Sequence, residues 1–313
     1  MAVKGHALCW DVASPKWLES LGTCRLREAL YRHIRTTVGH FYGRCVSWDV
    51  VNEALNHAKQ DCSGNLADNV FLRKLGPSYI DDCFRVAHQV DPNVKLFYND
   101  DKVEGAGLPD GRSDKADAMV KLLRGMKDRG VPVHGVGLQA HLDSCGKGFR
   151  RTPTPHSIRR NIRRLGEMGL EVNISEMDVR VRKLPHTIDA FQAQREIYRD
   201  ILTAAFAEPS FSGVTFWGVS DVHSWVHNFY GEDDPLLWDR GYRRKPAWTG
   251  VMEALQTLNT GRVFPRDEGA KLSGTPGSGS NQSIRSAADI EPEASWGRKW
   301  IPKELPQDKG WGC

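Results

Sequence analysis

Two glutamates, each at the end of a short apolar run, could act together as a pair. Glu53 ends the segment Trp48-Asp-Val-Val-Asn-Glu53, and Glu176 lies in Ile174-Ser-Glu-Met-Asp178. Cleavage of a glycosidic bond needs one carboxylic acid to protonate the leaving oxygen and a second carboxylate on the opposite face of the sugar ring. A lone glutamate after a strand is usually a solvated loop residue. Both glutamates together, with Asn52 directly before the first, favour this chemistry, because Asn52 could donate to the 2-hydroxyl of the sugar.

The spacing of such a pair decides how the bond is cleaved. A separation of about 5 to 5.5 Å makes the second carboxylate a nucleophile, and the sugar then keeps its anomeric configuration. The acid needs a raised pKa and the nucleophile must stay ionised, so the two carboxyls need different surroundings.

The elements that must position this pair repeat along the chain. Short apolar runs recur about every 40 residues and alternate with helical patterns, which is typical of parallel βα units. The six runs are Val3–Trp10, Cys45–Val51, Val94–Tyr98, Gly135–Gln139, Glu171–Ser175 and Gly213–Gly218. The helical segments are Leu26–Val38, Tyr79–Val90, Ser113–Arg129, Pro155–Met168, Ile188–Ala207 and Ala247–Leu258.

This alternation predicts an α/β fold, a (β/α)8 TIM barrel of which six strands can be identified. Polar residues gather where the runs end, at the barrel face that carries active sites. We expect the barrel to occupy residues 1–262. The stretch 263–313, with its Gly/Ser/Pro/Asn tract at Ser273–Ser283, is expected to be a disordered linker or tail.

The composition excludes several classes of partner. The formal net charge of +4 is divided between 43 basic and 39 acidic side chains, a balance that does not indicate nucleic acid. The arginines between Arg150 and Arg164 alternate with Ile158, Ile162 and Leu165, which predicts the polar face of an amphipathic helix. No segment approaches the roughly 18 to 20 apolar residues that span a bilayer. The N-terminus shows no signal-peptide core.

Taken together, the motifs of the chain resemble those of glycoside hydrolase family 10, the endo-β-1,4-xylanases, over roughly residues 1–258. They occur in the family's order and spacing. The motifs are Lys4-Gly-His-Ala-Leu-Cys-Trp10, Trp48–Glu53, Leu96-Phe-Tyr-Asn-Asp100, Gly135-Val-Gly-Leu-Gln-Ala-His141, Ile174–Asp178, Phe216-Trp-Gly-Val-Ser-Asp221 with Trp225, Pro235-Leu-Leu-Trp238 and Lys245-Pro-Ala-Trp248.

The resemblance implies roles for individual residues. Glu53 would be the acid/base and Glu176 the nucleophile of a retaining endo-1,4-β-xylanase. His141 would bond to the nucleophile, with Asp178 supporting it. The implied substrate-binding residues are His6, Trp10, Asn52, Gln139, His141, Trp217 and Trp225. Trp238 and Trp248 are expected to pack at the barrel end, and Asn99 and Asp100 to hold the end of their strand.

Three departures from the family pattern leave an alternative open. The family begins with two more strands, so the resemblance implies a barrel incomplete at its N-terminus and a coding sequence upstream of Met1. Asp11 and Ala13 replace a usual histidine and glutamine, and Asp101 replaces a tyrosine expected to stack on the leaving-group side. The alternative is an inactive or weakly xylan-binding truncated barrel.

The resemblance also sets expectations for partners and location. It implies a polysaccharide substrate, no cofactor, no metal, a monomer and an extracellular location. A metal-dependent hydrolase using His6, His141, His223 and Asp221 is disfavoured, because no His-x-His pair stands at a strand end.

Overall fold

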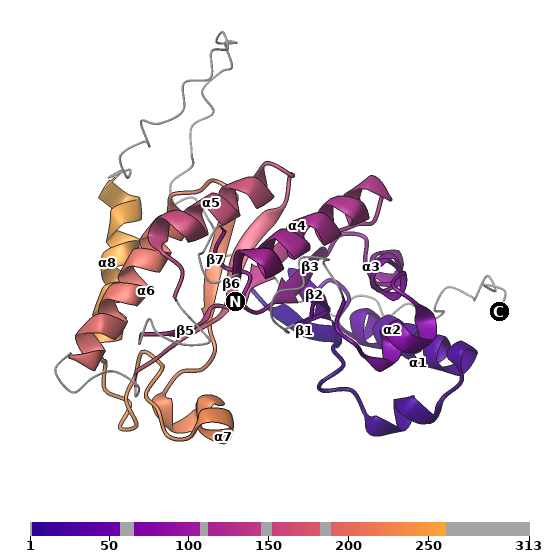
Figure 1. Cartoon of the computed structure of the whole chain (residues 1–313), viewed down its shortest axis with the longest axis horizontal. Coiled ribbons are helices and arrows are strands. Elements are labelled where there is room, and N and C mark those ends of the chain that lie inside the picture. Colours follow the sequence, from indigo (N-terminus) through magenta and orange to yellow (C-terminus); the bar gives the residue numbers. More distant parts are fainter. Residues whose placement is uncertain (1, 57–65, 107–111, 145–151, 182–188, 261–313) are drawn as a thin grey trace, which may run out of the picture. The chain divides into compact units, whose positions relative to one another are not determined.

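A computed structural model describes residues 2–56, 66–106, 112–144, 152–181 and 189–260, which all belong to one unit, Met1–Phe264. The predicted tail, 263–313, lies outside the described residues. The core of the unit is a sheet of seven strands in which every pairing is parallel (Figure 1). The strands are β1 (Lys4–Cys9), β2 (Ser47–Asn52), β3 (Lys95–Asp100), β4 (Gly135–Leu138), β5 (His141–Asp143), β6 (Glu171–Arg180) and β7 (Phe211–Phe216).

Six of the seven strands are the predicted runs, and β5 is the strand that was not predicted. The sheet order is β1-β2-β3-β4-β6, with β7 on the other side of β6. The first half of β6 pairs with β4 and its second half with β5, so β4 and β5 together fill one strand position. The α/β barrel prediction with six strand positions is confirmed. Within the described residues the sheet forms an open arc, because β1 pairs only with β2 and β7 only with β6.

Helices follow most of the strands. The α-helices are α1 (Thr23–His40), α2 (Val70–Leu75), α3 (Tyr79–Val90), α4 (Arg112–Asp128), α5 (Pro155–Gly166), α6 (Ala190–Phe206), α7 (Val226–Tyr230) and α8 (Pro246–Thr260). Capping residues begin several of them: Asn69 accepts from the N–H of Leu72 before α2, and Thr154 accepts from the N–H of Ser157 before α5.

The arginine-rich segment forms α5 as predicted. Ile158, Ile162 and Leu165 are buried on one face, and the arginines make ion pairs outside it. Arg159 and Arg163 both bind Glu208, and Arg164 pairs with Asp117. These three arginines therefore have carboxylate partners within the chain.

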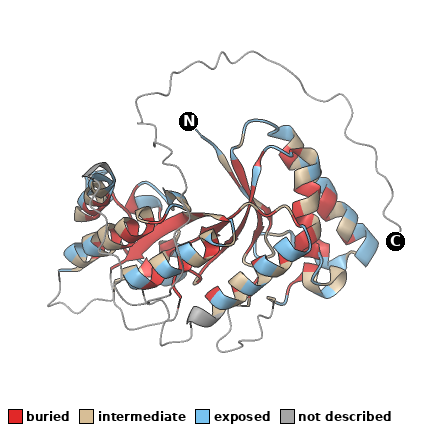
Figure 2. Cartoon of the chain, turned by 90° about the horizontal axis from the view of Figure 1, so that it is seen from above, coloured by how far each residue is buried: buried red, intermediate tan, exposed pale blue. Residues whose placement is uncertain are grey.

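Most of the buried side chains are apolar. Every residue of β2 and β4 is buried, and in Figure 2 the strands are mostly red while the helices turn pale blue faces outward. Trp238 and Trp248 pack against this core, as predicted. Among the described residues, no helix has the length and apolar character to span a membrane.

Candidate active site

The two glutamates lie at the carboxyl ends of β2 and β6. Glu53 directly follows β2, and its N–H donates to the carbonyl of Asn99 at 2.9 Å. Its φ of 54° lies in the left-handed region, where a non-glycine residue is held at a cost of about 1 to 2 kcal/mol. Glu176 lies within β6, and its N–H donates to the carbonyl of Gln139 at 3.1 Å.

An irregularity in β6 surrounds Glu176. Ile174 pairs with Val214 and Met177 pairs with Phe216, so β6 has one more residue than β7 over this interval. An extra residue of this kind bends a strand and changes where its side chains point. The local backbone thus sets the direction of the Glu176 carboxylate.

Amide side chains connect the two carboxylates. The amide of Gln139 donates to Oε1 of Glu53 at 2.9 Å, and the amide of Asn99 donates to Oε1 of Glu176 at 2.7 Å. Both amides also reach the side chain of Asn52, at 3.3 and 2.8 Å respectively. Gln139, Asn99 and Asn52 are each at most 3% exposed. Because these three side chains form a continuous network, Glu53 and Glu176 lie at the same edge of the sheet.

A histidine and an aspartate lie behind Glu176. Nε2 of His141 is 3.3 Å from Oε2 of Glu176, and Nδ1 is 3.0 Å from Oδ2 of Asp178. Burial alone would lower the pKa of His141, but the charges and hydrogen bonds of Asp178 and Glu176 raise it to about 10. His141 is therefore a buried cation between two carboxylates at neutral pH.

Aromatic side chains surround the carboxylates. The indole N–H of Trp10 donates to Oε2 of Glu53 at 3.1 Å, and that of Trp225 donates to Oδ2 of Asp178 at 2.7 Å. The Trp225 ring also lies 4.7 Å from that of His141. Trp217 lies 5.4 Å from His6, measured between ring centroids. The predicted tryptophans thus contact the site.

His6, on β1, lies between Asp49 and Glu176. Its Nδ1 is 3.0 Å from Oδ2 of Asp49 and 4.0 Å from Oε1 of Glu176. Burial would lower the pKa of His6, but the hydrogen bond and charge of Asp49 raise it. Lys4 pairs with the other oxygen of Asp49 at 3.0 Å. All ten residues predicted for the site are therefore linked into one set of contacts.

Sequence reasoning missed two members of this set, Asn99 and Asp49. Asn99 was expected to hold the end of its strand, but its amide binds Glu176 directly, and its own oxygen accepts from Ser175 at 2.6 Å. The signal that could have identified it is its place at the end of β3, opposite Asn52 at the end of β2. Asp49 lies inside an apolar run, and a buried carboxylate in such a run itself indicates a partner.

Asp101, one of the departures from the family pattern, is an ion-pair partner. It is 6% exposed and binds the amine of Lys115 at 2.7 Å, together with Asp100. Asp100 also accepts from the hydroxyl of Tyr98. Asp101 thus joins α4 to the end of β3.

The residues of the metal-site alternative are divided between two places. His6 and His141 lie at Glu176, whereas Asp221 pairs with Lys245 at 2.9 Å and His223 lies 3.1 Å from the hydroxyl of Tyr242. The part of the chain that the structure describes contains no group of three or more His, Cys, Asp or Glu side chains placed to hold a metal ion.

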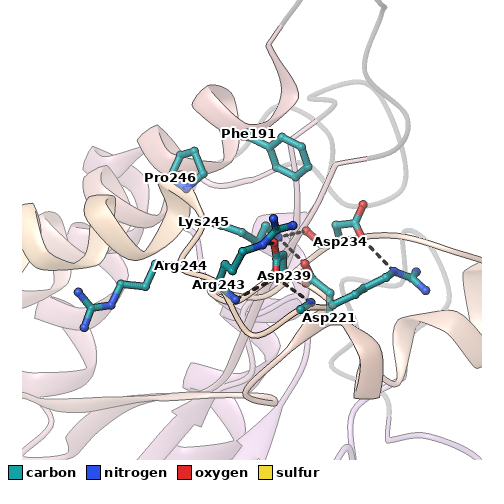
Figure 3. A pocket seen from close by; sticks show the side chains of 10 residues that line it. Phe191, Asp221, Asp234, Asp239, Arg243, Arg244, Lys245 and Pro246 are labelled. Atoms are coloured by element: carbon teal, nitrogen blue, oxygen red, sulfur yellow. Dashed lines mark hydrogen bonds and ion pairs between the residues drawn. The ribbon is translucent and has the colours of Figure 1, made fainter.

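A pocket of about 400 Å³ opens near Asp221, between the start of α6 and the segment before α8 (Figure 3). Most of its charged side chains pair with one another: Lys245 with Asp221, Arg243 with Asp239 at 2.8 Å, and Arg240 with Asp234 at 3.4 Å. These pairs support the loop that follows β7.

A parallel α/β barrel sheet with two glutamates joined at the carboxyl ends of its strands defines the class of barrel glycoside hydrolases. The chain belongs to glycosyl hydrolase family 10, whose sequence model matches residues 1–254.

Several named proteins are similar to this chain. Endo-1,4-beta-xylanase A of Humicola insolens is 39% identical over 253 residues, which are 80% of this chain and 63% of that enzyme. An endo-1,4-beta-xylanase of Agaricus bisporus is 35% identical over 254 residues, 80% of this chain and 71% of the relative. The chain thus spans less than two thirds of the length of the Humicola enzyme.

Solved structures give the same family. Native xylanase 10B of Thermotoga maritima superimposes with a TM-score of 0.75 at 33% identity, covering 84% of this chain and 76% of that one. Xylanase 10B of Thermotoga petrophila, in complex with xylobiose, gives a TM-score of 0.74 at 33% identity, covering 82% and 75%.

Proposed function

We propose that this protein is a retaining endo-1,4-β-xylanase in which Glu53 is the acid/base and Glu176 the nucleophile. The observation that carries the proposal is the amide network through which Gln139, Asn52 and Asn99 connect the two carboxylates. The names of the similar proteins, endo-1,4-beta-xylanases, support the choice of substrate.

The reaction takes two displacements. Glu53 donates its proton to the glycosidic oxygen while a Glu176 oxygen attacks the anomeric carbon, so the leaving chain departs as an alcohol and a glycosyl ester forms. Glu53, now a carboxylate, takes a proton from water, and the water oxygen displaces Glu176. The products are two shorter xylan chains, and the enzyme is restored.

Neighbouring side chains serve these steps. His141, held by Asp178, orients the Glu176 carboxylate, and Trp10 and Gln139 fix the two oxygens of Glu53. Asn52 is proposed to bind the 2-hydroxyl of the sugar. His6, Trp217 and Trp225 are proposed to line the sugar-binding surface and exclude water.

The roles of the two glutamates are distinguished by the leaving group. Glu176→Ala should abolish release of reducing ends from xylan. Glu53→Ala should do the same on xylan but keep the first displacement on an aryl xylobioside, because an acidic phenol leaves without a proton. Glu28→Ala, at a surface ion pair with Arg32 on α1, is the control and should match the wild type. Equal xylan hydrolysis by Glu176→Ala and wild type would reject the assignment.

The stereochemical outcome is an independent test. Proton NMR of the first products should show the β-anomer before mutarotation. An α-anomer would mean inversion and a water between carboxyls about 6.5 to 9.5 Å apart.

A barrel that binds xylan weakly without hydrolysing it is the second candidate, favoured by the burial of Asp101 against Lys115. Aspartate has no ring to stack on a sugar, as the family's tyrosine is expected to do, and the carboxylate of Asp101 is bound to Lys115 of α4. Xylan binding without hydrolysis in the wild type would support this candidate.

We place the protein outside the cell, since polymeric xylan does not cross membranes. We also propose that the protein is a monomer. Secretion of xylanase activity into the medium and one monomeric peak in size-exclusion chromatography would support this.

A further inference from the structure

A buried carboxylate that the proposed reaction does not use binds the backbone between Gln139 and His141. Glu104 belongs to the loop after β3 and is 6% exposed. Its Oε1 accepts the backbone N–H of Ala140 at 2.9 Å. Burial raises the pKa of Glu104, while hydrogen bonds from backbone N–H groups and the charge of His141 act in the opposite direction.

Ala140 has an unusual backbone conformation. Its φ is 58°, in the left-handed region that side chains other than glycine rarely adopt. The residue lies between β4, which ends at Leu138, and β5, which begins at His141. Its carbonyl accepts the N–H of Asp178 at 3.3 Å. Its N–H to Glu104 and its carbonyl to β6 therefore hold this turn from opposite sides.

The residues on either side of Ala140 each contact one of the two glutamates. Gln139, directly before Ala140, donates to Glu53 at 2.9 Å. His141, directly after Ala140, lies 3.3 Å from Glu176. A change in the backbone dihedral angles of Ala140 would rotate Gln139 relative to His141. The conformation of this one residue therefore affects both the distance from Gln139 to Glu53 and the distance from His141 to Glu176.

The loop of Glu104 is itself fixed from behind. The amide of Asn161, a fully buried residue of α5, donates to the carbonyls of Val103 at 2.7 Å and Glu104 at 3.2 Å. Ser157, also on α5, donates to the carbonyl of Ala106 at 2.8 Å. Hydrogen bonds from α5 thus hold the backbone of the loop that carries Glu104.

We infer that Glu104 is a positioning residue, which holds the left-handed turn at Ala140 and so places Gln139 against Glu53 and His141 against Glu176. The role rests on the proposed function of the two glutamates. Glu104 acts through the backbone and does not touch the sugar.

A matched pair of variants isolates the hydrogen bond. Glu104→Gln and Glu104→Met are both uncharged and similar in length, but only glutamine can accept the Ala140 N–H. We expect Glu104→Gln to keep kcat on xylan within a few-fold. Glu104→Met should lose about 10- to 100-fold in kcat, as small misplacements of catalytic groups do, with KM little changed.

Titration of His141 gives a readout that does not need activity. In wild type and Glu104→Gln, NMR of labelled histidine should show His141 protonated up to a pKa of about 10. In Glu104→Met that pKa should fall toward 6.5 as Asp178 and Glu176 move away. A purely structural role would lower stability and leave this titration unchanged.

Ala140→Gly tests the turn itself. Glycine adopts positive φ without strain, so Ala140→Gly added to Glu104→Met should restore part of kcat and part of the His141 shift. The control is Glu208→Met, which removes a carboxylate that is equally buried and paired with Arg159 and Arg163. It should lower thermal stability without changing kcat or the His141 titration.

The proposal is overturned if folded Glu104→Met keeps the wild-type kcat and His141 titration, or if Glu104→Gln loses both. Should Glu104→Met fail to fold, Glu104→Gln decides the question: it overturns the proposal if it loses kcat and the His141 shift, and supports it if it keeps both. A wild-type protein without xylanase activity whose His141 titration responds to Glu104→Met would reject the function and retain the positioning role.

Discussion

At the residue scale, the carboxylate pair is held mainly by neutral amides. Gln139 orients the Glu53 carboxylate without adding a charge. On the other side, Glu176 accepts from the amide of Asn99 and faces protonated His141. The two carboxylates therefore meet different partners, as a division into acid and nucleophile requires.

Asn99 should matter for catalysis although it was predicted only to hold its strand. Asn99→Ala removes the donor 2.7 Å from Glu176 and should lower kcat about 10- to 100-fold, because the carboxylate loses an orienting hydrogen bond. Steady-state kinetics on xylan measure this loss. Asn69→Ala is the matched control: Asn69 is also buried, but it caps α2. It should lower stability by about 1 kcal/mol and leave kcat unchanged. The interpretation fails if both variants keep the wild-type kcat.

His141 predicts an alkaline loss of stability. Its folded pKa of about 10 exceeds the 6.5 of an unperturbed histidine, so the stabilisation is complete below the lower value and is lost as pH rises through the higher one. Since one pKa unit corresponds to about 1.4 kcal/mol, the loss should be on the order of a few kcal/mol. Urea unfolding between about pH 7 and pH 10.5 should show a steeper decline for wild type than for His141→Asn. Parallel curves would mean that His141 is neutral in the folded protein.

The sequence predicts the residues that carry recognisable chemistry better than the contacts that orient them. Glu53 and Glu176 could be proposed because their type and strand-end positions indicate a reaction, and His141 could be proposed because it lies in a family motif. Glu104 could not, because its role depends on a hydrogen bond to Ala140 and on the positive φ of that residue, which no local sequence pattern encodes.

At the element scale, long periodic segments were predicted well and short ones were not. Tyr79–Val90 coincides with α3, and Pro155–Met168 differs from α5 only at its end. The six-residue α2 and the three-residue β5 were missed, because a segment this short shows no period. The run Glu171–Ser175 was extended in the structure to Arg180, since β6 continues beyond β4 to pair with β5.

Helices α6 and α8 pack closely against each other, and this packing leaves no room for a side chain at Gly250 (Figure 1). A Cβ on Gly250 would collide with the backbone carbonyl of Arg195. Gly250→Ala should therefore separate the helices and lower the free energy of unfolding by about 1 to 3 kcal/mol. Urea denaturation measures the change.

The same substitution in α4 should have the opposite sign. A Cβ on Gly125 would meet only the end of the flexible Arg129 side chain, at 2.9 Å. Gly125→Ala should raise the free energy of unfolding by about 0.5 to 1 kcal/mol, the usual gain in a helix interior. Equal effects at the two positions would show that helix propensity, not packing between α6 and α8, decides both.

At the scale of the whole molecule, the two candidate functions differ in what happens after the sugar binds. Both need a folded sheet that presents Trp10, Trp217 and Trp225 around the carboxylates. Only the enzyme needs Glu176 as a nucleophile. A ligand that binds the folded state alone stabilises it by mass action, so thermal unfolding reports binding separately from cleavage.

Glu176→Gln, which keeps the shape of the side chain but not its charge, should bind a xylo-oligosaccharide without cleaving it. At a ligand concentration about 100 times Kd the free energy of unfolding should rise by about 2.7 kcal/mol, because unfolded chains do not bind the sugar. Tm should increase by about 5 to 10 °C for a domain of this size. A cello-oligosaccharide of equal length is the control and should give a smaller increase. Stabilisation of Glu176→Gln together with cleavage by the wild type supports the enzyme, and stabilisation of both proteins without cleavage supports the binding barrel. If the sugar stabilises neither protein and the wild type cleaves no xylan, both candidates are contradicted.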